Sequence, residues 1–140
     1  MTAAAALPPF QTVAAVITDA RGHVLLVRKR GSAFFIQPGG KREPGETALQ
    51  TLARELNEEL GVRLRPTSAE LLGHFEDLAV NEPGRRVRAE VYRVQVDGEP
   101  RPGAEIEALH WLDPVPPHDV PVAPLSARHI LPAQLRLGSP

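Results

Sequence analysis

One segment near the middle of the chain constrains the fold most: a loop rich in glycine and proline that leads directly into an amphipathic helix. Residues 37–46 (Gln-Pro-Gly-Gly-Lys-Arg-Glu-Pro-Gly-Glu) must form a loop, because proline and glycine interrupt them throughout. Apolar residues then recur at helical spacing over residues 47–60, at Leu49, Leu52, Ala53, Leu56 and Leu60. Glu46 and Thr47 offer hydrogen-bond acceptors at the start of this helix, and Gly61 lies where a C-terminal cap belongs.

The segments on either side of this helix are predicted to be mainly strands. Residues 11–28 are interpreted as a β-hairpin around a turn at 19–22. The other expected elements are strands at 34–36, 70–77, 87–96 and 106–112 and a last helix at 125–136. Pro132 is expected to bend or break that helix. Because strands and helices do not alternate regularly, we expect a mixed α/β (α+β) fold.

The strand predicted at 87–96 is irregular. Its apolar residues alternate with polar ones up to Val91 and then continue from Tyr92 with the opposite parity. Either a bulge or a strand that is buried on both faces would explain this change.

Length and composition indicate one globular domain. We expect a single domain over residues 1–140, in which residues 1–10, with Pro8-Pro9 and no periodicity, form a flexible arm. Apolar residues make up 42% of the chain and charged residues 24%, as is typical of soluble proteins. No apolar run approaches the ~18 residues of a membrane span, and residues 1–6 lack the features of a signal peptide. We therefore expect a cytoplasmic protein without a membrane partner.

Charge and cysteine content exclude several classes of function. The net charge is −1, from 16 basic and 17 acidic residues, whereas nucleic-acid-binding proteins carry a basic excess. We therefore expect no stable binding to nucleic acid. The chain contains no cysteine, which excludes disulfides, zinc–thiolate sites and cysteine nucleophiles.

Three glutamates gather on one side of the predicted helix. Glu55, Glu58 and Glu59 fall within an arc of roughly 100°, beside the apolar arc instead of opposite it. Each pair of like charges at these spacings costs roughly 0.2–0.5 kcal/mol, and the helix dipole disfavours anions in the C-terminal half. A solvated acidic surface, with Arg54 paired to a neighbour, is one interpretation. A divalent cation such as Mg²⁺, which prefers carboxylate ligands, is the other.

The loop before the helix favours the metal interpretation. Its glycines let the main chain approach a ligand closely, and Lys41 and Arg42 suit phosphate oxygens. Together, the loop and the acidic arc predict a site for a metal ion and a phosphorylated ligand.

The stretch from Gly40 to Val62 resembles the Nudix box. Gly40 is followed after five residues by Glu46 and after seven more by Arg-Glu-Leu-Asn-Glu-Glu-Leu-Gly-Val at 54–62, which matches every fixed position of that pattern. The resemblance implies a Nudix-type α/β/α sandwich with a mixed β-sheet. It also implies a metal-dependent pyrophosphohydrolase that cleaves a nucleoside diphosphate linked to another group.

The resemblance further implies roles for residues of the box. Arg54 would pair with Glu46 and fix the loop against the helix, and Glu55 or Glu58 would act as the base for the attacking water. The implied ligands of Mg²⁺ (or Mn²⁺) are Glu55, Glu58, Glu59 and the carbonyl of Gly40 or its neighbour Gly39.

Residues outside the box complete the expected site. In proteins of the MutT type a further carboxylate often lies six residues before a tryptophan. Six residues before Trp111 is Glu105, and Glu107 is the alternative. The residues expected to bind the substrate's phosphates and nucleoside are Lys41, Arg28 and Phe35. The five histidines are dispersed and are assigned no role.

The substrate is the least determined property. The short chain and its late proline-rich connector resemble MutT-like enzymes, so the expected reaction converts a (d)NTP to an NMP and pyrophosphate. The asparagine that such enzymes use for an oxidised guanine is missing, because residues 121–125 read Pro-Val-Ala-Pro-Leu. An ADP-ribose or nucleotide-sugar pyrophosphatase is the alternative, and a non-catalytic nucleotide-sensing domain is disfavoured because every box carboxylate is present. The oligomeric state is left open between a monomer and a homodimer.

Overall fold

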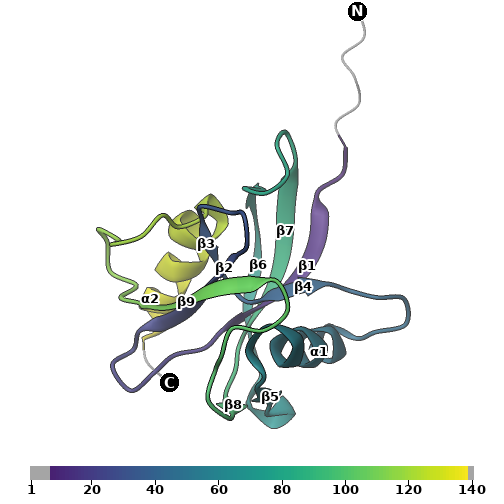
Figure 1. Ribbon diagram of the computed structural model, residues 1–140, viewed down its shortest axis with the longest axis vertical. Helices are drawn as coiled ribbons and strands as arrows, with labels where there is room; N and C mark the ends of the chain where they lie inside the picture. The colour runs from purple at the N-terminus through teal and green to yellow at the C-terminus, as the bar shows by residue number, and fades with distance from the viewer. Residues whose placement is uncertain (1–6, 139–140) are drawn as a thin grey trace, which may run out of the picture.

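The computed structural model describes residues 7–138, in which strands lie between two helical layers (Figure 1). The strands are β1 (Phe10–Val16), β2 (Val24–Lys29), β3 (Phe35–Ile36), β4 (Gly39–Lys41), β5 (Arg63–Leu64), β6 (Glu70–Leu78), β7 (Arg86–Arg93), β8 (Val96–Asp97) and β9 (Ile106–Leu112). The helical segments are α1 (Ala48–Leu60), a short 3₁₀ turn η1 (Pro66–Ser68), η2 (Leu125–Ile130) and α2 (Leu131–Leu137). Figure 1 shows α1 on one side of the strands and the C-terminal helical segments on the other.

The strands pair in three groups. A four-stranded sheet has the order β4-β1-β7-β6, in which β1 is parallel to β7 and antiparallel to β4. A three-stranded antiparallel sheet has the order β3-β2-β9, and β5 pairs with β8 alone. The mixed sheet between helical layers confirms the predicted fold class.

Each face of the strand layer has its own hydrophobic core. In β1, Val13 and Ala15 belong to the core beneath α1, whereas Ala14 and Val16 belong to the core beneath η2 and α2. The residues of β2 divide between the two cores in the same way. Because neighbouring side chains of a strand point to opposite faces, a strand covered on both sides is a continuous apolar run.

The predicted helix at 47–60 is confirmed as α1, with caps at both ends. Thr47 Oγ1 accepts a hydrogen bond from the Gln50 N–H at 3.1 Å, and the Gln50 side chain accepts one from the Thr47 N–H at 2.9 Å. This reciprocal pair is a capping box. At the other end Gly61 adopts a left-handed φ of 68°, and its N–H donates to the Asn57 carbonyl.

The C-terminal helix predicted at 125–136 consists of two parts. Residues of η2 are π-helical, and the chain becomes α-helical at Leu131. Pro132 is the second residue of α2, which follows η2 without a break, so it lacks the N–H that would donate back into the preceding turn. The change of helix type next to Pro132 confirms the predicted irregularity there.

The predicted hairpin at 11–28 is wrong. Its turn forms, with the Gly22 N–H donating to the Asp19 carbonyl at 3.0 Å, and one bridge joins Thr18 to Val24. The two strands then separate, since β1 pairs with β4 and β7 while β2 pairs with β3 and β9. Both strands are buried on both faces, so their apolar runs did not distinguish between possible partners.

The loop predicted at 37–46 contains the short strand β4. The ideal Cβ position of Gly39, whose φ is 145°, lies 2.1 Å from the Val13 carbonyl oxygen. Only a residue without a side chain lets β4 pair this closely with β1. The glycines that predicted a loop are therefore the residues that allow the strand.

The irregularity predicted within 87–96 has two causes. The register between β6 and β7 shifts so that Leu71 pairs with Tyr92 but Gly73 pairs with Val91, which leaves one extra residue on β6. Val91 also lies in one core and Tyr92 packs against the other. A bulge opposite this strand and burial of both its faces are therefore both present.

The predicted arm at residues 1–10 is described only in part. Residues 1–6 lie outside the described residues, and Phe10 is already the first residue of β1. The Pro8 carbonyl accepts a hydrogen bond from Arg85 Nη2 at 2.9 Å. None of the helices within residues 7–138 is long and apolar enough to cross a membrane.

Candidate active site

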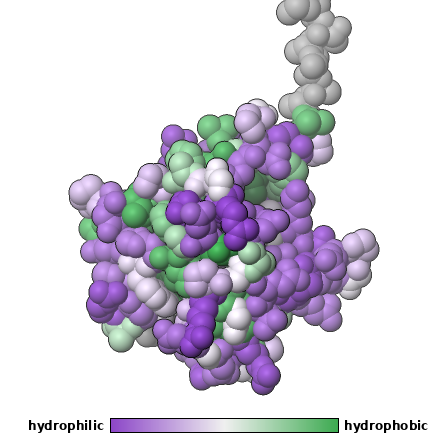
Figure 2. Space-filling model, in the orientation of Figure 1, coloured by the Kyte–Doolittle hydropathy of each residue, from purple (hydrophilic) through white to green (hydrophobic). Residues whose placement is uncertain are grey.

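A cavity of about 680 Å³ lies between α1, β4 and the loop that joins β6 to β7. Its charged lining residues are Lys29, Lys41, Arg42, Glu43, Arg54, Glu55, Glu58, Glu59, Glu82 and Glu105. The apolar lining comes largely from strand ends and from η2, at Phe10, Leu78, Val80, Val87 and Leu125. Figure 2 shows that the surface over α1 and the loop before it is hydrophilic. The cavity therefore combines a charged region with an apolar one.

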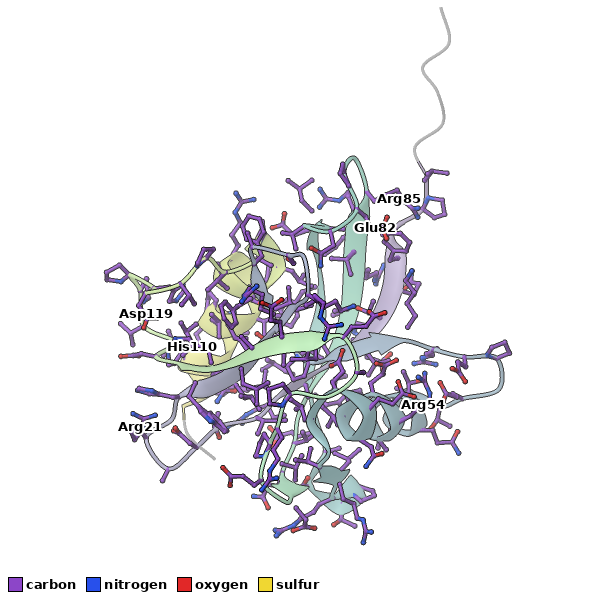
Figure 3. All side chains as sticks on the ribbon, in the orientation of Figure 1. Arg21, Arg54, Glu82, Arg85, His110 and Asp119 are labelled. Carbon is purple, nitrogen blue, oxygen red and sulfur yellow. The ribbon has the colours of Figure 1, made fainter. Side chains whose placement is uncertain are left out.

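Arg54 braces the loop before α1 against the helix (Figure 3). Its Nε and Nη2 donate to the two carboxylate oxygens of Glu46 at 2.8 and 2.9 Å, and Nη2 also donates to the Lys41 carbonyl at 3.1 Å. Glu46 accepts further hydrogen bonds from the Glu43 N–H and the Thr51 hydroxyl. The hydrogen bonds from Arg54 lower the pKa of Glu46 to about 2. The expected pairing of Arg54 with Glu46 is thus present and charged.

Glu55 lies directly against Gly40. The ideal Cβ position of Gly40 is 2.4 Å from Glu55 Cδ, so any larger residue there would displace the carboxylate. Arg54 Nη1 donates to Glu55 Oε1 at 2.9 Å. Burial raises the pKa of Glu55, and the neighbouring Arg54 opposes this effect only in part.

Glu59 is the most buried of the three box glutamates and is only 6% exposed. Its Oε1 accepts a hydrogen bond from the Gly39 N–H at 3.0 Å, which ties α1 to β4. Burial raises the pKa of Glu59 to about 7, although this hydrogen bond lowers it. A carboxyl group in such a place gains from a nearby cation, which favours its ionised form.

The three box carboxylates line one cavity without surrounding a single point. Glu58 is half-exposed, with its Oε1 3.8 Å from Arg54 Nη1. Within residues 7–138, no three histidine or carboxylate side chains are placed to hold a metal ion together. Like charges repel, and Glu55 and Glu59 instead take donors from Arg54 and Gly39. The donor set still has the chemistry that a hard cation requires, with carboxylate oxygens beside the main chain of Gly39 and Gly40.

The two candidate loop carboxylates face different surroundings. Glu105 lines the cavity together with the box glutamates, and the chain around it is a turn that precedes β9. Glu107 lies outside that lining, half-exposed, with its Oε1 3.8 Å from Arg28 Nη2. Of the two, only Glu105 can face a ligand in the cavity.

The residues expected to bind substrate are also separated by the structure. Lys41 lines the cavity, with its Nζ 4.0 Å from the centre of the Phe10 ring. Arg28 and Phe35 are paired between β2 and β3 and lie outside the lining, and Phe35 is 8% exposed within the second core. Pairing in register places their side chains on one face of the sheet, away from α1. Neither side chain is therefore placed to contact a ligand in this cavity.

Sequence reasoning missed the walls formed by the β6–β7 loop and by η2. Residues 78–82 follow the strand predicted at 70–77 and were assigned no role, yet all five line the cavity, as do Leu125 and Ser126. No motif marks these positions, because they reach the cavity only through the folding of distant segments.

A buried carboxylate joins these two walls. Asp77, 6% exposed on β6, accepts hydrogen bonds from His129 Nε2 at 2.9 Å and from Arg128 Nη1 at 3.4 Å, both on η2. Burial raises the pKa of Asp77, but hydrogen bonds from the Leu78 N–H and His129 outweigh it, so the pKa lies below its usual range. His129, a histidine to which the sequence assigned no role, thus fixes one wall of the cavity. His110 forms a similar pair with Asp119 elsewhere on the surface (Figure 3).

In comparisons with known proteins, a family model and a solved structure agree on the same family. A family model described as the NUDIX domain matches residues 8–133. A MutT NUDIX hydrolase from Burkholderia pseudomallei has a similar solved structure, with a TM-score of 0.73 and 26% identity over 95% of this chain and 100% of that chain.

Two curated relatives differ in how much of their length this chain spans. An octanoyltransferase of Myxococcus xanthus is 36% identical over 115 residues, which are 76% of this chain but 31% of that protein. The 8-oxo-dGTP diphosphatase of Escherichia coli (strain K12) is 30% identical over 124 residues, which are 80% of this chain and 92% of that protein. The chain therefore spans less than a third of the first relative and nearly all of the second.

Proposed function

This chain belongs to the NUDIX family, and we propose that it is a divalent-metal-dependent pyrophosphohydrolase whose substrate is a nucleoside di- or triphosphate derivative. The observation that carries the proposal is the composition of one cavity. Three glutamates of α1 and cations of β2 and β4 line it together with an apolar wall. A nucleoside polyphosphate has the matching parts: phosphates for the charged region and a nucleoside for the apolar one.

The proposed ligands of Mg²⁺ or Mn²⁺ are Glu55, Glu58, Glu59 and the carbonyl of Gly40. When bound, such an ion polarises phosphate oxygens and lowers the pKa of a coordinated water. The donor set fits because Gly40 has no side chain and so brings β4 against the Glu55 carboxylate. Arg54 would keep its hydrogen bond to Glu55 Oε1, while the other carboxylate oxygen of Glu55 would serve the ion.

The remaining cavity residues are assigned to binding and proton transfer. Lys29 and Lys41 form no ion pair with any residue in the described part of the chain, so they are free to bind phosphate oxygens. Glu55 or Glu58 accepts the proton of the water that attacks phosphorus, and pyrophosphate leaves with the electron pair of the broken anhydride bond. Glu105, which lies outside the box, adds a fourth carboxylate to the part of the cavity that the three box glutamates line. Arg54 acts by holding the loop in place.

We further propose that the substrate is a (d)NTP, which is hydrolysed to an NMP and pyrophosphate. The support is the 30% identity to a diphosphatase over 92% of that protein's length. A net charge of −1 supports action on small nucleotides instead of on nucleic acid. An oxidised guanine nucleotide is not singled out, because residues 121–125 contain no asparagine.

A substrate panel tests this proposal. The purified protein is incubated with (d)NTPs, ADP-ribose, nucleotide sugars and dinucleoside polyphosphates, with Mg²⁺ or Mn²⁺, and the products are separated by ion-exchange chromatography. We expect NMP and pyrophosphate from at least one (d)NTP, and loss of the activity after chelation. A preference for ADP-ribose or a nucleotide sugar would replace the (d)NTP assignment. Turnover that survives exhaustive chelation would overturn the metal-dependent mechanism itself.

A further inference from the structure

The loop that carries Glu105 is attached to the C-terminal end of α1. The Arg101 N–H donates to the Leu60 carbonyl at 2.9 Å, and the Gly103 N–H donates to the Glu59 carbonyl at 2.8 Å. Carbonyls in the last turn of a helix have no partner within the helix, so such bonds from a loop satisfy them. The loop is thereby fixed to the same helical turn that carries Glu58 and Glu59.

This attachment leaves no room for a side chain at residue 103. The ideal Cβ position of Gly103 lies 2.6 Å from the Glu58 carbonyl oxygen and 3.5 Å from that of Glu59. Both contacts are with main-chain atoms of a helix, which cannot rotate away as a side chain can. Any larger residue at 103 must therefore move the loop away from α1.

The next three residues form a tight turn. The Ile106 N–H donates to the Gly103 carbonyl at 2.9 Å, and Ala104, the first central residue of this turn, has a φ of 46°. Among the described residues other than glycine, Ala104 alone has a positive φ. Such a turn favours glycine at this position, because a Cβ is strained there. The Glu105 carbonyl accepts a hydrogen bond from the Arg30 N–H at 2.9 Å.

We propose that Gly103 and Ala104 are positioning residues that hold the Glu105 carboxylate over the C-terminal part of α1, which carries Glu58 and Glu59. Gly103 sets the distance between the loop and the helix, and the positive φ of Ala104 directs Glu105 into the cavity that Glu58 and Glu59 line. This inference rests on the proposed function, in which Glu105 contributes to a metal site. Non-glycine residues with unusual backbone angles gather at functional sites when the surrounding contacts enforce them.

Mn²⁺ binding without nucleotide tests this positioning directly. Free Mn²⁺ is measured by its electron paramagnetic resonance signal in titrations of the wild type, G103A, E105Q and the double variant G103A/E105Q. We expect E105Q and G103A each to weaken Mn²⁺ binding about 10-fold or more, as loss of a group in or beside a metal site commonly does. We expect the double variant to bind Mn²⁺ no more weakly than E105Q alone, because Gly103 acts through Glu105.

Glu107 and Ala104 provide the matched controls. E107Q changes a carboxylate two residues after Glu105 that pairs with Arg28 outside the cavity. The effects of E107Q and G103A on the free energy of Mn²⁺ binding should therefore add. A104G keeps the positive φ without a Cβ and should bind Mn²⁺ within about twofold of the wild type. A104V, whose β-branched side chain opposes a positive φ, should bind as weakly as E105Q. Its melting temperature, measured alongside, shows whether the variant is folded.

The possible results separate the inference from the proposed function. If the wild type binds no Mn²⁺, or if E105Q leaves the affinity unchanged, the metal-site role of Glu105 fails and this inference fails with it. If E105Q weakens binding while G103A and A104V do not, the proposed function stands and the positioning role is overturned. An effect of G103A that adds fully to that of E105Q overturns it as well, because Gly103 would then act on the helix and not through the loop carboxylate.

Discussion

The Arg54 guanidinium holds both carboxylate oxygens of Glu46, with Nε 2.8 Å from one and Nη2 2.9 Å from the other. A planar fork of donors meets a planar pair of acceptors, and this geometry is specific to arginine. The pair spans from the loop to the second turn of α1, and the same guanidinium reaches Glu55. One side chain therefore links the fold of the loop to the position of a candidate metal ligand.

R54K is expected to lower activity about 10-fold or more while the protein stays folded. Lysine keeps the charge but replaces the fork with a single ammonium group, so Glu46 and Glu55 can no longer be held together. Turnover and melting temperature of the variant are compared with those of R65K, which changes a similar arginine–aspartate pair far from the cavity. Equal activity of R54K and R65K would show that Arg54 does not position the residues of the site.

Acid is expected to weaken the fold through Glu46. Its pKa is lowered from the ordinary 4.5 to about 2 by the hydrogen bonds from Arg54. A carboxyl group with a depressed folded-state pKa stabilises the protein fully above pH 4.5, and this contribution is lost as the pH falls towards 2. Urea unfolding of the wild type and E46Q should therefore differ most at neutral pH and converge in acid. A constant difference across this range would contradict the assignment.

E58Q is expected to abolish most activity without harming the fold. The amide keeps the size of the side chain but is a poor ligand for a hard cation and a poor base, so turnover should fall by about 10²–10⁴-fold. Without metal, the melting temperature should stay the same or rise slightly, since one of three like charges is removed. Steady-state kinetics and thermal unfolding check both parts, and a loss below about threefold would leave Glu58 outside the mechanism.

E105Q is expected to cost more activity than E107Q, and most when Mg²⁺ is limiting. Glu105 lines the cavity, whereas Glu107 pairs with Arg28 outside it. A carboxylate that helps to bind the ion should matter less once the ion is saturating. Activity of both variants is therefore measured over a Mg²⁺ titration. Small and equal losses at every concentration would show that the box glutamates act without the loop.

The helix and its chemistry were predictable because their determinants are local. The spacing of Leu52, Leu56 and Leu60, with Thr47 before them and Gly61 after, specifies a capped amphipathic helix within 15 residues. The pairing of Glu46 with Arg54, which the resemblance to the Nudix box implied, is local as well, since loop and helix are contiguous.

Features that depend on distant segments were not predictable in the same way. The apolar runs of β1 and β2 show that both strands are buried, but β1 pairs with β7 and β2 with β9, and both of these partners lie far away in the chain. Asp77 meets His129 across 52 residues, and neither position has a pattern around it that indicates the other. Phe35 follows an ordinary strand pattern, and its direction relative to the cavity is fixed by its pairing with Arg28 and its bridge to Val122.

The division of β1 between two cores limits how its length can change. Val13 to Val16 alternate between the layers, and Gly39 is matched to one carbonyl of this strand. A one-residue insertion would rotate every later side chain into the opposite layer and place a different carbonyl over Gly39. We therefore expect insertions and deletions among related chains to concentrate in the β6–β7 loop and in the proline-rich segment between β9 and η2. In β1 and β2 we expect substitutions that leave the length of the strand unchanged.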